Sequence, residues 1–328
     1  MGLTNFPNGI SSMGMPVING VPAGLTECFF VDYGNGSNGV GKKANSASRP
    51  WKTLEYALTQ VTTNKNEGIA LMGNSTHTLA AMLDVSINRT HIFGYDPGVG
   101  GYGQNAKVSL TATATATNIA TMQNTGVRNT FRNIKFINAS TVAEGLYCIA
   151  EGGEYAKYYG CEVYKSTDLD EALAAELLCN GDSAQFSGCV FGDLVNQKGG
   201  ATKERPNVLL TRETLTGKVA RDVEFNDCLF LTKAATTAAS CVHSTLATDV
   251  ERRMIFRNPI FWNAKLGAAD PAAAISLDAA QTQGDILLIN PAIIGITALA
   301  TSSKGVYVVG GSVPADPTTG IAVAVDGS

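Results

Sequence analysis

The sequence predicts an all-β solenoid, a fold in which short parallel strands stack coil upon coil, and three observations support that fold class. Glycine accounts for 35 of the 328 residues, hydrophobic residues for 45% and charged residues for only 16%, a composition that suits many strands joined by turns. From about residue 68 the chain consists of short apolar runs separated by turn residues, as expected for strands. A six-residue pattern then recurs between residues 131 and 313.

The repeated pattern is apolar-x-(Asn, Gly or Asp)-x-x-apolar, as in FRNIKF (131–136), FSGCVF (186–191) and FNDCLF (225–230). Its third position holds only residue types that tolerate a left-handed backbone conformation. These positions, called the bend column below, are Asn133, Gly160, Gly188, Asp227, Asn258, Asn290 and Gly310. We therefore expect a tight bend between two strands in each repeat, with the flanking apolar side chains stacked in the core.

Three successive repeats carry a cysteine at the fourth position, namely Cys161, Cys189 and Cys228. Adjacent coils would hold these residues about 4.8 Å apart. That spacing is compatible with a disulfide, although a row of buried, inert thiols is the simpler interpretation. None of the seven cysteines belongs to a C-x-x-C pair.

Residues 1–27 predict an extended anchoring arm, because Pro7, Pro16 and Pro22 interrupt a segment with only isolated apolar side chains. The arm side chains expected to contact a partner are Phe6, Pro7, Ile10, Met13, Met15 and Val17.

Residues 28–67 predict an entry strand, FFVDY (29–33), then a loop rich in Gly, Asn and Ser, and then a helix opened by Ser48 and Pro50. One apolar stripe runs along this helix, formed by Leu54, Ala57, Leu58 and Val61. A single amphipathic helix before a β-rich region indicates a short capping α-helix.

Residues 68–328 predict the solenoid itself, with strands in GIALMG, HTLAAMLDVSI, THIFGYDPG and the Ala/Thr-rich run KVSLTATATATNIATM. Two loop insertions are expected, near 168–182 and near 197–207, and the first of these has the composition of a short helix.

The stretch FFVDYGNGSNGVGKKANSASRPWKTLEYAL resembles the entry to pectate-lyase-like right-handed parallel β-helices, and GIALMGNSTHTLAAMLDVSINRTHIFGYDPG resembles the first coils of that family. With the repeats, the resemblance covers residues 28–313 and implies a right-handed parallel β-helix. The segment NFPNGISSMGMPV resembles the start of virion structural proteins of tailed bacteriophages.

The sequence predicts no catalytic residue, no metal site and no cofactor. The acidic clusters EGGE (151–154) and DLDE (168–171) are expected to be solvated loop charges, and the Gly-His-Gly and Arg-Ile-Lys signatures of the family's hydrolases are absent. Trp262 should be exposed beside inward-facing repeat positions, where simple packing, a sugar contact and a subunit contact all stay open.

The formal net charge of −4, without a long basic run, disfavours nucleic acid and anionic membrane partners. The N-terminus lacks the features of a signal peptide, and no apolar run is long enough to span a bilayer, so we expect a soluble protein made in a cytoplasm.

Together these observations predict a non-enzymatic virion structural protein that decorates or stabilises the capsid surface, as a cement or head-spike protein anchored by its arm. The expected partners are the major capsid protein or other virion subunits, the expected oligomer is a homotrimer, and assembly would take place in the host bacterial cytoplasm. The alternatives are a tail spike or receptor-binding protein with a polysaccharide-degrading β-helix, and another fibre, neck or baseplate component. A lyase or hydrolase activity stays open.

Overall fold

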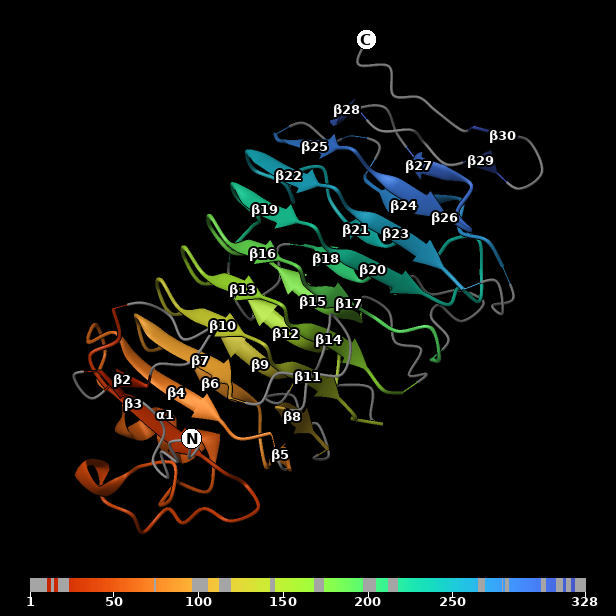
Figure 1. The fold of residues 1–328 in the computed structure, drawn as a ribbon. Helices are drawn as coiled ribbons and strands as arrows, with labels where there is room; N and C mark the ends of the chain where they lie inside the picture. The colour runs from red at the N-terminus through yellow and green to blue at the C-terminus, as the bar shows by residue number, and fades with distance from the viewer. Residues whose placement is uncertain are drawn as a thin grey trace, which may run out of the picture.

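The computed structural model is a right-handed parallel β-helix with three large parallel sheets around an apolar core (Figure 1). The structure describes residues 24–73, 75–95, 106–111, 119–141, 145–167, 174–196, 205–211, 218–264, 269–278, 280, 283–301 and 305–310, and four two-residue strands near the termini. The coils rise from the red end, where β3 lies, to the blue end, where β28 lies.

The three large parallel sheets, which we number 1, 2 and 3, contain the strands β3 to β28. Sheet 1 contains β3 (Cys28–Val31), β4 (Glu67–Leu71), β7 (Thr90–Gly94), β10 (Thr130–Arg132), β13 (Lys157–Tyr159), β16 (Gln185–Ser187), β19 (Val223–Asn226), β22 (Arg253–Arg257), β25 (Asp285–Ile289) and β28 (Val306–Val309). Sheet 2 contains β5 (Thr76–Leu79), β8 (Lys107–Leu110), β11 (Lys135–Asn138), β14 (Glu162–Lys165), β17 (Val190–Phe191), β20 (Leu229–Thr232), β23 (Ile260–Asn263) and β26 (Ala292–Ile294). Sheet 3 contains β6 (Leu83–Val85), β9 (Ala120–Asn124), β12 (Tyr147–Glu151), β15 (Ala175–Cys179), β18 (Val208–Leu210), β21 (Val242–Ser244), β24 (Ala273–Ser276) and β27 (Ala298–Ala300).

The remaining elements are short. They are the antiparallel pair β1 (Ser11–Ser12) and β2 (Met15–Pro16), the 3-10 helix η1 (Lys42–Ala44), the α-helix α1 (Leu54–Gln60), and the antiparallel pair β29 (Ala315–Asp316) and β30 (Gly320–Ile321). No helix in the described segments is long and apolar enough to cross a membrane.

Each coil runs from sheet 1 through a tight bend into sheet 2, then into sheet 3, and returns to sheet 1 through a corner. Every position of the bend column has a positive φ, between 49° and 69°, so the predicted left-handed backbone is present in all seven repeats. Side chains also join successive bends, because the Asn258 amide donates to Asp227 Oδ1 (2.8 Å) and the Asn290 amide donates to Asn258 Oδ1 (3.2 Å).

The apolar residues that flank the bend stack inside the solenoid, as the repeat predicts. Before the bend the stacked rings are Phe131, Tyr158, Phe186, Phe225 and Phe256, with neighbouring centroids 4.6 to 4.8 Å apart. After the bend they are Phe191, Phe230 and Phe261, with centroids 5.3 and 5.0 Å apart. Stacked aromatic pairs contribute about 0.5–1.5 kcal/mol each beyond the area they bury, so both columns stabilise the register between coils.

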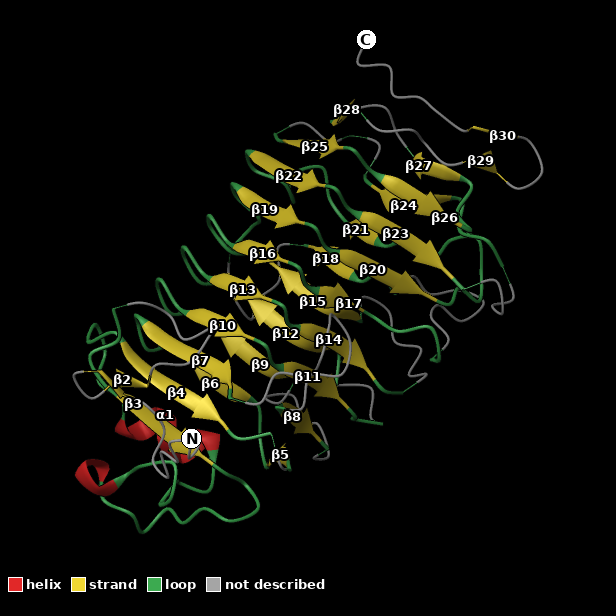
Figure 2. Ribbon diagram, viewed as in Figure 1, coloured by secondary structure: helices red, strands yellow, loops and turns green. Residues whose placement is uncertain are grey.

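The helix α1 lies at the β3 end of the molecule, where it covers the first coil (Figure 2). Its predicted apolar stripe is buried in the core cluster: Leu54, Ala57, Leu58 and Val61. The predicted start is wrong, because Thr53 rather than Ser48 caps the helix, and its side chain accepts from the Tyr56 amide (3.2 Å). Trp51 forms a bridge to β3, which keeps the chain extended after Pro50 and delays the helix.

The predicted insertion at 168–182 is also wrong in part, because Ala175–Cys179 is the strand β15 and not a loop or a helix. This strand pairs with β12 on one side and β18 on the other, and that pairing overrides the helical preference of its Ala, Glu and Leu residues.

Several predictions fall on residues that the structure does not describe. They concern the arm side chains Phe6, Pro7, Ile10, Met13, Met15 and Val17, the Ala/Thr run at 112–118, and the insertions at 168–173 and 197–204. Among these six arm residues, Met15 is the one whose backbone the structure describes, and it pairs with Ser12.

Candidate functional site

Glu151 is an inward-facing carboxylate at the end of β12, not the solvated loop charge expected from the sequence. It is fully buried and accepts a hydrogen bond from the Tyr158 hydroxyl, from the Asn124 amide (2.9 and 3.0 Å) and from the Gly153 N–H (2.6 Å). Burial raises the pKa of Glu151 from 4.5 to about 7, because loss of water disfavours the charge more than these donors favour it.

The partners of Glu151 extend this buried network to other coils. The Asn129 amide donates to Asn124 Oδ1 (2.9 Å), and Asn129 Oδ1 accepts from the Thr90 N–H (2.9 Å). Because the Asn124–Glu151 and Thr90–Asn129 contacts join one coil to the next, we assign the network a structural role.

Cys161, Cys189 and Cys228 are buried, free thiols in the described structure. The Cys189 thiol lies 3.6 Å from the Tyr158 carbonyl oxygen, and the Cys228 thiol lies 3.4 Å from the Phe186 carbonyl oxygen. Burial raises the pKa of Cys161 and Cys228 well above the usual thiol value. The structure therefore contains three buried free thiols in this row and no disulfide between them.

The corner between sheet 3 and sheet 1 contains a second column of left-handed residues, which the sequence pattern did not reveal. Its members are Arg89 (φ 56°), Arg128 (61°), Tyr155 (55°), Ser183 (57°) and Asp222 (51°). Backbone hydrogen bonds of 2.7 to 2.9 Å join the first three of these corners to the next coil. Because the column mixes Arg, Tyr, Ser and Asp, no single class of residue marks it in the sequence.

A groove lies over the first corners of this column, and we call it the basic groove. It has a volume of about 460 Å³ and is lined by Asn66, Arg89, His91, Arg128, Thr130, Tyr155 and Lys157. Arg128 lies over the ring of Tyr155, 5.6 Å from its centroid. Burial lowers the pKa of His91, so its imidazole is neutral at neutral pH.

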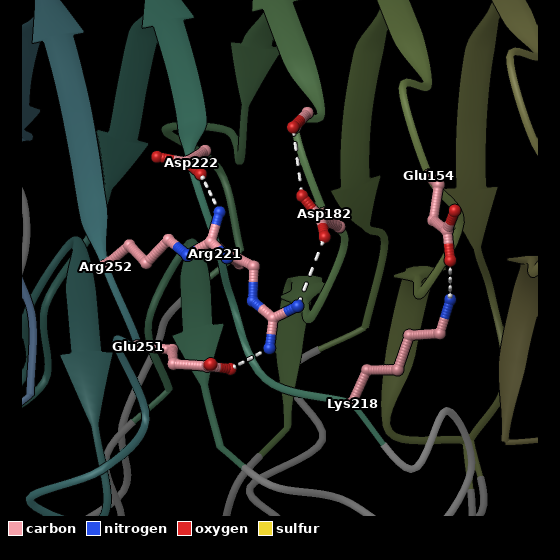
Figure 3. Close-up of polar contacts among 8 residues, drawn as sticks. Glu154, Asp182, Lys218, Arg221, Asp222, Glu251 and Arg252 are labelled. Carbon is pink, nitrogen blue, oxygen red and sulfur yellow. Dashed lines mark hydrogen bonds and ion pairs between the residues drawn. The ribbon is translucent and has the colours of Figure 1, made fainter.

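An ion-pair ladder begins at Glu154, beside Tyr155, and continues over the later corners, where charged side chains of different coils point toward one another (Figure 3). The pairs are Lys218–Glu154 (3.3 Å), Arg221–Asp182 (3.4 Å), Arg221–Glu251 and Arg252–Asp222 (3.0 Å). Hydrogen bonds and attraction to Glu251 and Asp182 raise the pKa of Arg221 above its ordinary value. These carboxylates bind cations of the protein itself.

A second groove, called the aromatic groove, lies on the outer side of sheet 2. Its volume is about 700 Å³, and its walls include Lys135, Glu162, Tyr164, Val190, Leu231 and Trp262. Lys135 pairs with Glu162 (2.7 Å) and lies over the Tyr164 ring, 4.9 Å from its centroid. Trp262 is 37% exposed, as the sequence led us to expect, and this groove is the place where a sugar or a subunit could contact it.

The described part of the chain contains no group of three or more His, Cys, Asp or Glu side chains arranged to hold a metal ion. The two grooves are candidate binding surfaces, and of the residues that line them Trp262 was singled out from the sequence. The basic groove was missed because its cations come from three coils that are far apart in sequence.

Comparison with known proteins identifies the fold. No family model matches the chain, and no curated protein matches it in sequence. Pectin methylesterase from Aspergillus niger superposes with a TM-score of 0.58 and 14% identity, over 93% of this chain and 93% of its own. Pectate lyase Pel9A superposes with a TM-score of 0.54 and 10% identity, over 86% of this chain and 78% of its own.

ORF18 of Geobacillus virus E2 is a more remote match, with a TM-score of 0.37 and 8% identity over 76% of this chain and 57% of its own. A likeness this remote has no bearing on the role of the chain. The two enzymes share only 14% and 10% of their residues with this chain, so the likeness concerns the fold alone. The chain has the same right-handed parallel β-helix as a pectin methylesterase and a pectate lyase.

Proposed function

We propose that this protein is a non-enzymatic structural component of a tailed-phage virion, which decorates or stabilises the capsid and is anchored by residues 1–27. One observation carries the proposal. The carboxylates of the later corners are used in pairs between coils, and the buried carboxylate of Glu151 is enclosed by donors of the protein itself. Such an arrangement stabilises a long rigid body and leaves these acids unavailable for proton transfer to a substrate.

The position on the capsid is inferred from the proline-rich arm and its likeness to the start of virion structural proteins. In this proposal the partners are the major capsid protein or neighbouring virion subunits, the protein acts as a homotrimer, and it is neither bound to nucleic acid nor to a membrane.

The test is binding of the full chain to empty capsids of its source phage that lack this protein, compared with a variant lacking residues 1–25. The proposal expects cosedimentation of the full chain with capsids and its loss in the shortened variant. Sedimentation equilibrium of the free protein should give the mass of three chains. Absence of capsid binding by either form would contradict capsid decoration.

A second candidate function is a tail spike that binds or degrades a polysaccharide, and the aromatic groove favours it. Tyr164 and Trp262 offer ring faces beside the polar heads of Lys135 and Glu162, a combination that suits a sugar. The enzymes with the same fold, a pectin methylesterase and a pectate lyase, make such a ligand plausible chemically. A glycan array would detect it, and Trp262→Ala should abolish a signal that arises in this groove.

A further inference from the structure

Three cationic side chains line the basic groove, namely Arg89, Arg128 and Lys157. Within the described residues no carboxylate forms an ion pair with Arg89, Arg128 or Lys157. By contrast, Arg221 and Arg252 are each paired with an acid of another coil. The walls of the groove contain no carboxylate either.

Neighbouring coils bring these like charges close together. Arg89 and Arg128 occupy equivalent corners of successive coils, which are about 4.8 Å apart in a parallel sheet. Tyr155 occupies the next corner, and Lys157 follows it two residues later. Lys157 pairs with Thr130 of the coil before, beside the two arginines in the same groove. Three cations held this close repel one another, and an anion between them would remove that repulsion.

The residue types at these corners are costly for the backbone conformation they adopt. Arg89, Arg128 and Tyr155 are all left-handed, a conformation that favours Gly, Asn and Asp. The bend column, which has the same conformation, uses only those three types. A side chain kept at such a position despite the strain indicates that the side chain itself has a use.

We propose that the basic groove binds a phosphate ester, with the phosphate between Arg89 and Arg128 and the organic part against the ring of Tyr155. A phosphomonoester carries about −1.5 to −2 charges at neutral pH, which matches three cations better than a single carboxylate does. Its oxygens suit the forked donors of two guanidinium groups. The cation–π contact between Arg128 and Tyr155 holds that guanidinium in place before the ligand arrives.

The size of the groove and its aromatic wall favour an organic ester over a bare inorganic anion. A volume of about 460 Å³ lies within the usual range of small-molecule sites, and Tyr155 is 49% exposed. Thr130 and Asn66 supply neutral polar groups for hydroxyls, so a phosphorylated sugar is the chemical class that fits. The sugar phosphate could be free or displayed on a polysaccharide.

The test is isothermal titration calorimetry of the full chain with glucose 6-phosphate, with glucose, inorganic phosphate and dextran phosphate as further probes. We expect glucose 6-phosphate to bind about tenfold more tightly than inorganic phosphate, and glucose to give no signal. Tighter binding of dextran phosphate per phosphate group would support an ester displayed on a polysaccharide. Equal affinity per group would support a free sugar phosphate.

The variant Arg89→Asn/Arg128→Asn should weaken binding of glucose 6-phosphate by about tenfold or more, because charged hydrogen bonds to the phosphate are lost. Asparagine tolerates the left-handed backbone, so the variant should keep its fold, which circular dichroism would check. The matched control Arg252→Asn/Arg253→Asn makes the same change in net charge at two arginines that both pair with Asp222, and it should bind like the wild type.

Four outcomes would overturn the proposal. They are equal binding of glucose and its phosphate, equal binding of inorganic phosphate and the ester, an equal loss of affinity in the control variant, and tighter binding of a single-stranded oligonucleotide than of the sugar phosphate.

Discussion

The two halves of the corner column use charged residues in different ways. In the coils of β7, β10 and β13 the corner carries Arg89, Arg128 and Tyr155, and no described acid pairs with the two arginines. In the coils of β16 to β22 the corner carries all of the ion-pair ladder except Glu154, and Arg221 is bound there to acids on both sides (Figure 3). The backbone conformation is left-handed in both halves.

The ion-pair ladder and the basic groove therefore use surface charge for two purposes, the first for contacts between coils and the second for binding a ligand. Paired charges between coils satisfy one another and leave little to offer a ligand, whereas unpaired cations in a groove create a local positive potential. The net charge of −4 conceals that potential, because charge summed over the whole chain says nothing about its arrangement on one face. Four predictions test whether the halves differ at the surface only, beginning with the largest expected effect.

The aromatic stack runs beneath both halves, so its members should contribute alike. Phe131→Ala beneath the basic groove and Phe225→Ala beneath the ladder should each lower the free energy of unfolding by about 3–5 kcal/mol, because both rings are fully buried and stacked. Urea denaturation followed by circular dichroism measures this. A much smaller loss for Phe131→Ala would mean that the halves also differ in their cores.

Glu151 lies in the coil where the two halves meet, and its raised pKa predicts how stability changes with pH. Because the folded value of about 7 lies above the unfolded value of 4.5, its stabilising contribution is fully present below pH 4.5 and is lost as pH rises through about 7. Between those limits the wild type should lose on the order of 3 kcal/mol relative to Glu151→Gln. Unfolding curves of both proteins at about pH 4.5 and about pH 8 measure this difference. If the free energies of unfolding of the two proteins differ by the same amount at both pH values, Glu151 does not have a raised pKa in the folded protein.

The two left-handed columns should respond in opposite directions to substitution. Asn258→Ala in the bend should lower the free energy of unfolding by about 1 kcal/mol, because alanine tolerates that backbone less well and the amide contact with Asp227 is lost. Arg128→Asn at the corner should raise it by about 0.5 kcal/mol, because a strained position receives a tolerant residue. Thermal unfolding of both variants provides the comparison, and a loss of stability in Arg128→Asn would show that the arginine is structural.

The smallest expected effect concerns the surface charges themselves. Arg221→Gln should lower the urea midpoint at low salt, since Asp182 and Glu251 lose their shared partner, and added salt should reduce the difference. Arg128→Gln should leave the midpoint unchanged or raise it, since no described acid depends on that arginine. Equal, salt-independent midpoints for the two variants would remove the distinction between the halves.

The solenoid was predictable because its repeat unit is written locally in the sequence. Residues that favour a left-handed backbone recur at one position, with aromatic residues before and after them, so bend and core appear in a single six-residue window. The helix start was less predictable, because Thr53 and Ser48 are both good caps and a distant bridge from Trp51 to β3 decides between them. The strand β15 has the composition of a helix and is fixed by its two neighbours.

The grooves were not predictable, because neither is local in sequence. Arg89, Arg128 and Lys157 come from three coils, and only the register of sheet 1 brings them together. Glu151 belongs to a cluster that looks like a polar loop, and its inward direction depends on the alternation of β12. Trp262 was the exception. It directly follows an inward-facing repeat position, so the alternation of side chains along a strand predicts that it is exposed.

The strands of all three large sheets lie across the long axis, whereas the hydrogen bonds between coils point along it. Tension applied to the two ends of the molecule would therefore strain the backbone hydrogen bonds at each interface between coils. These interfaces lie in series along the axis, so each bears the same force. Each coil contacts mainly its neighbours, so rupture at one interface need not weaken the next. Under tension we expect coils to detach singly, from the end opposite α1, in a regular sawtooth of force against extension.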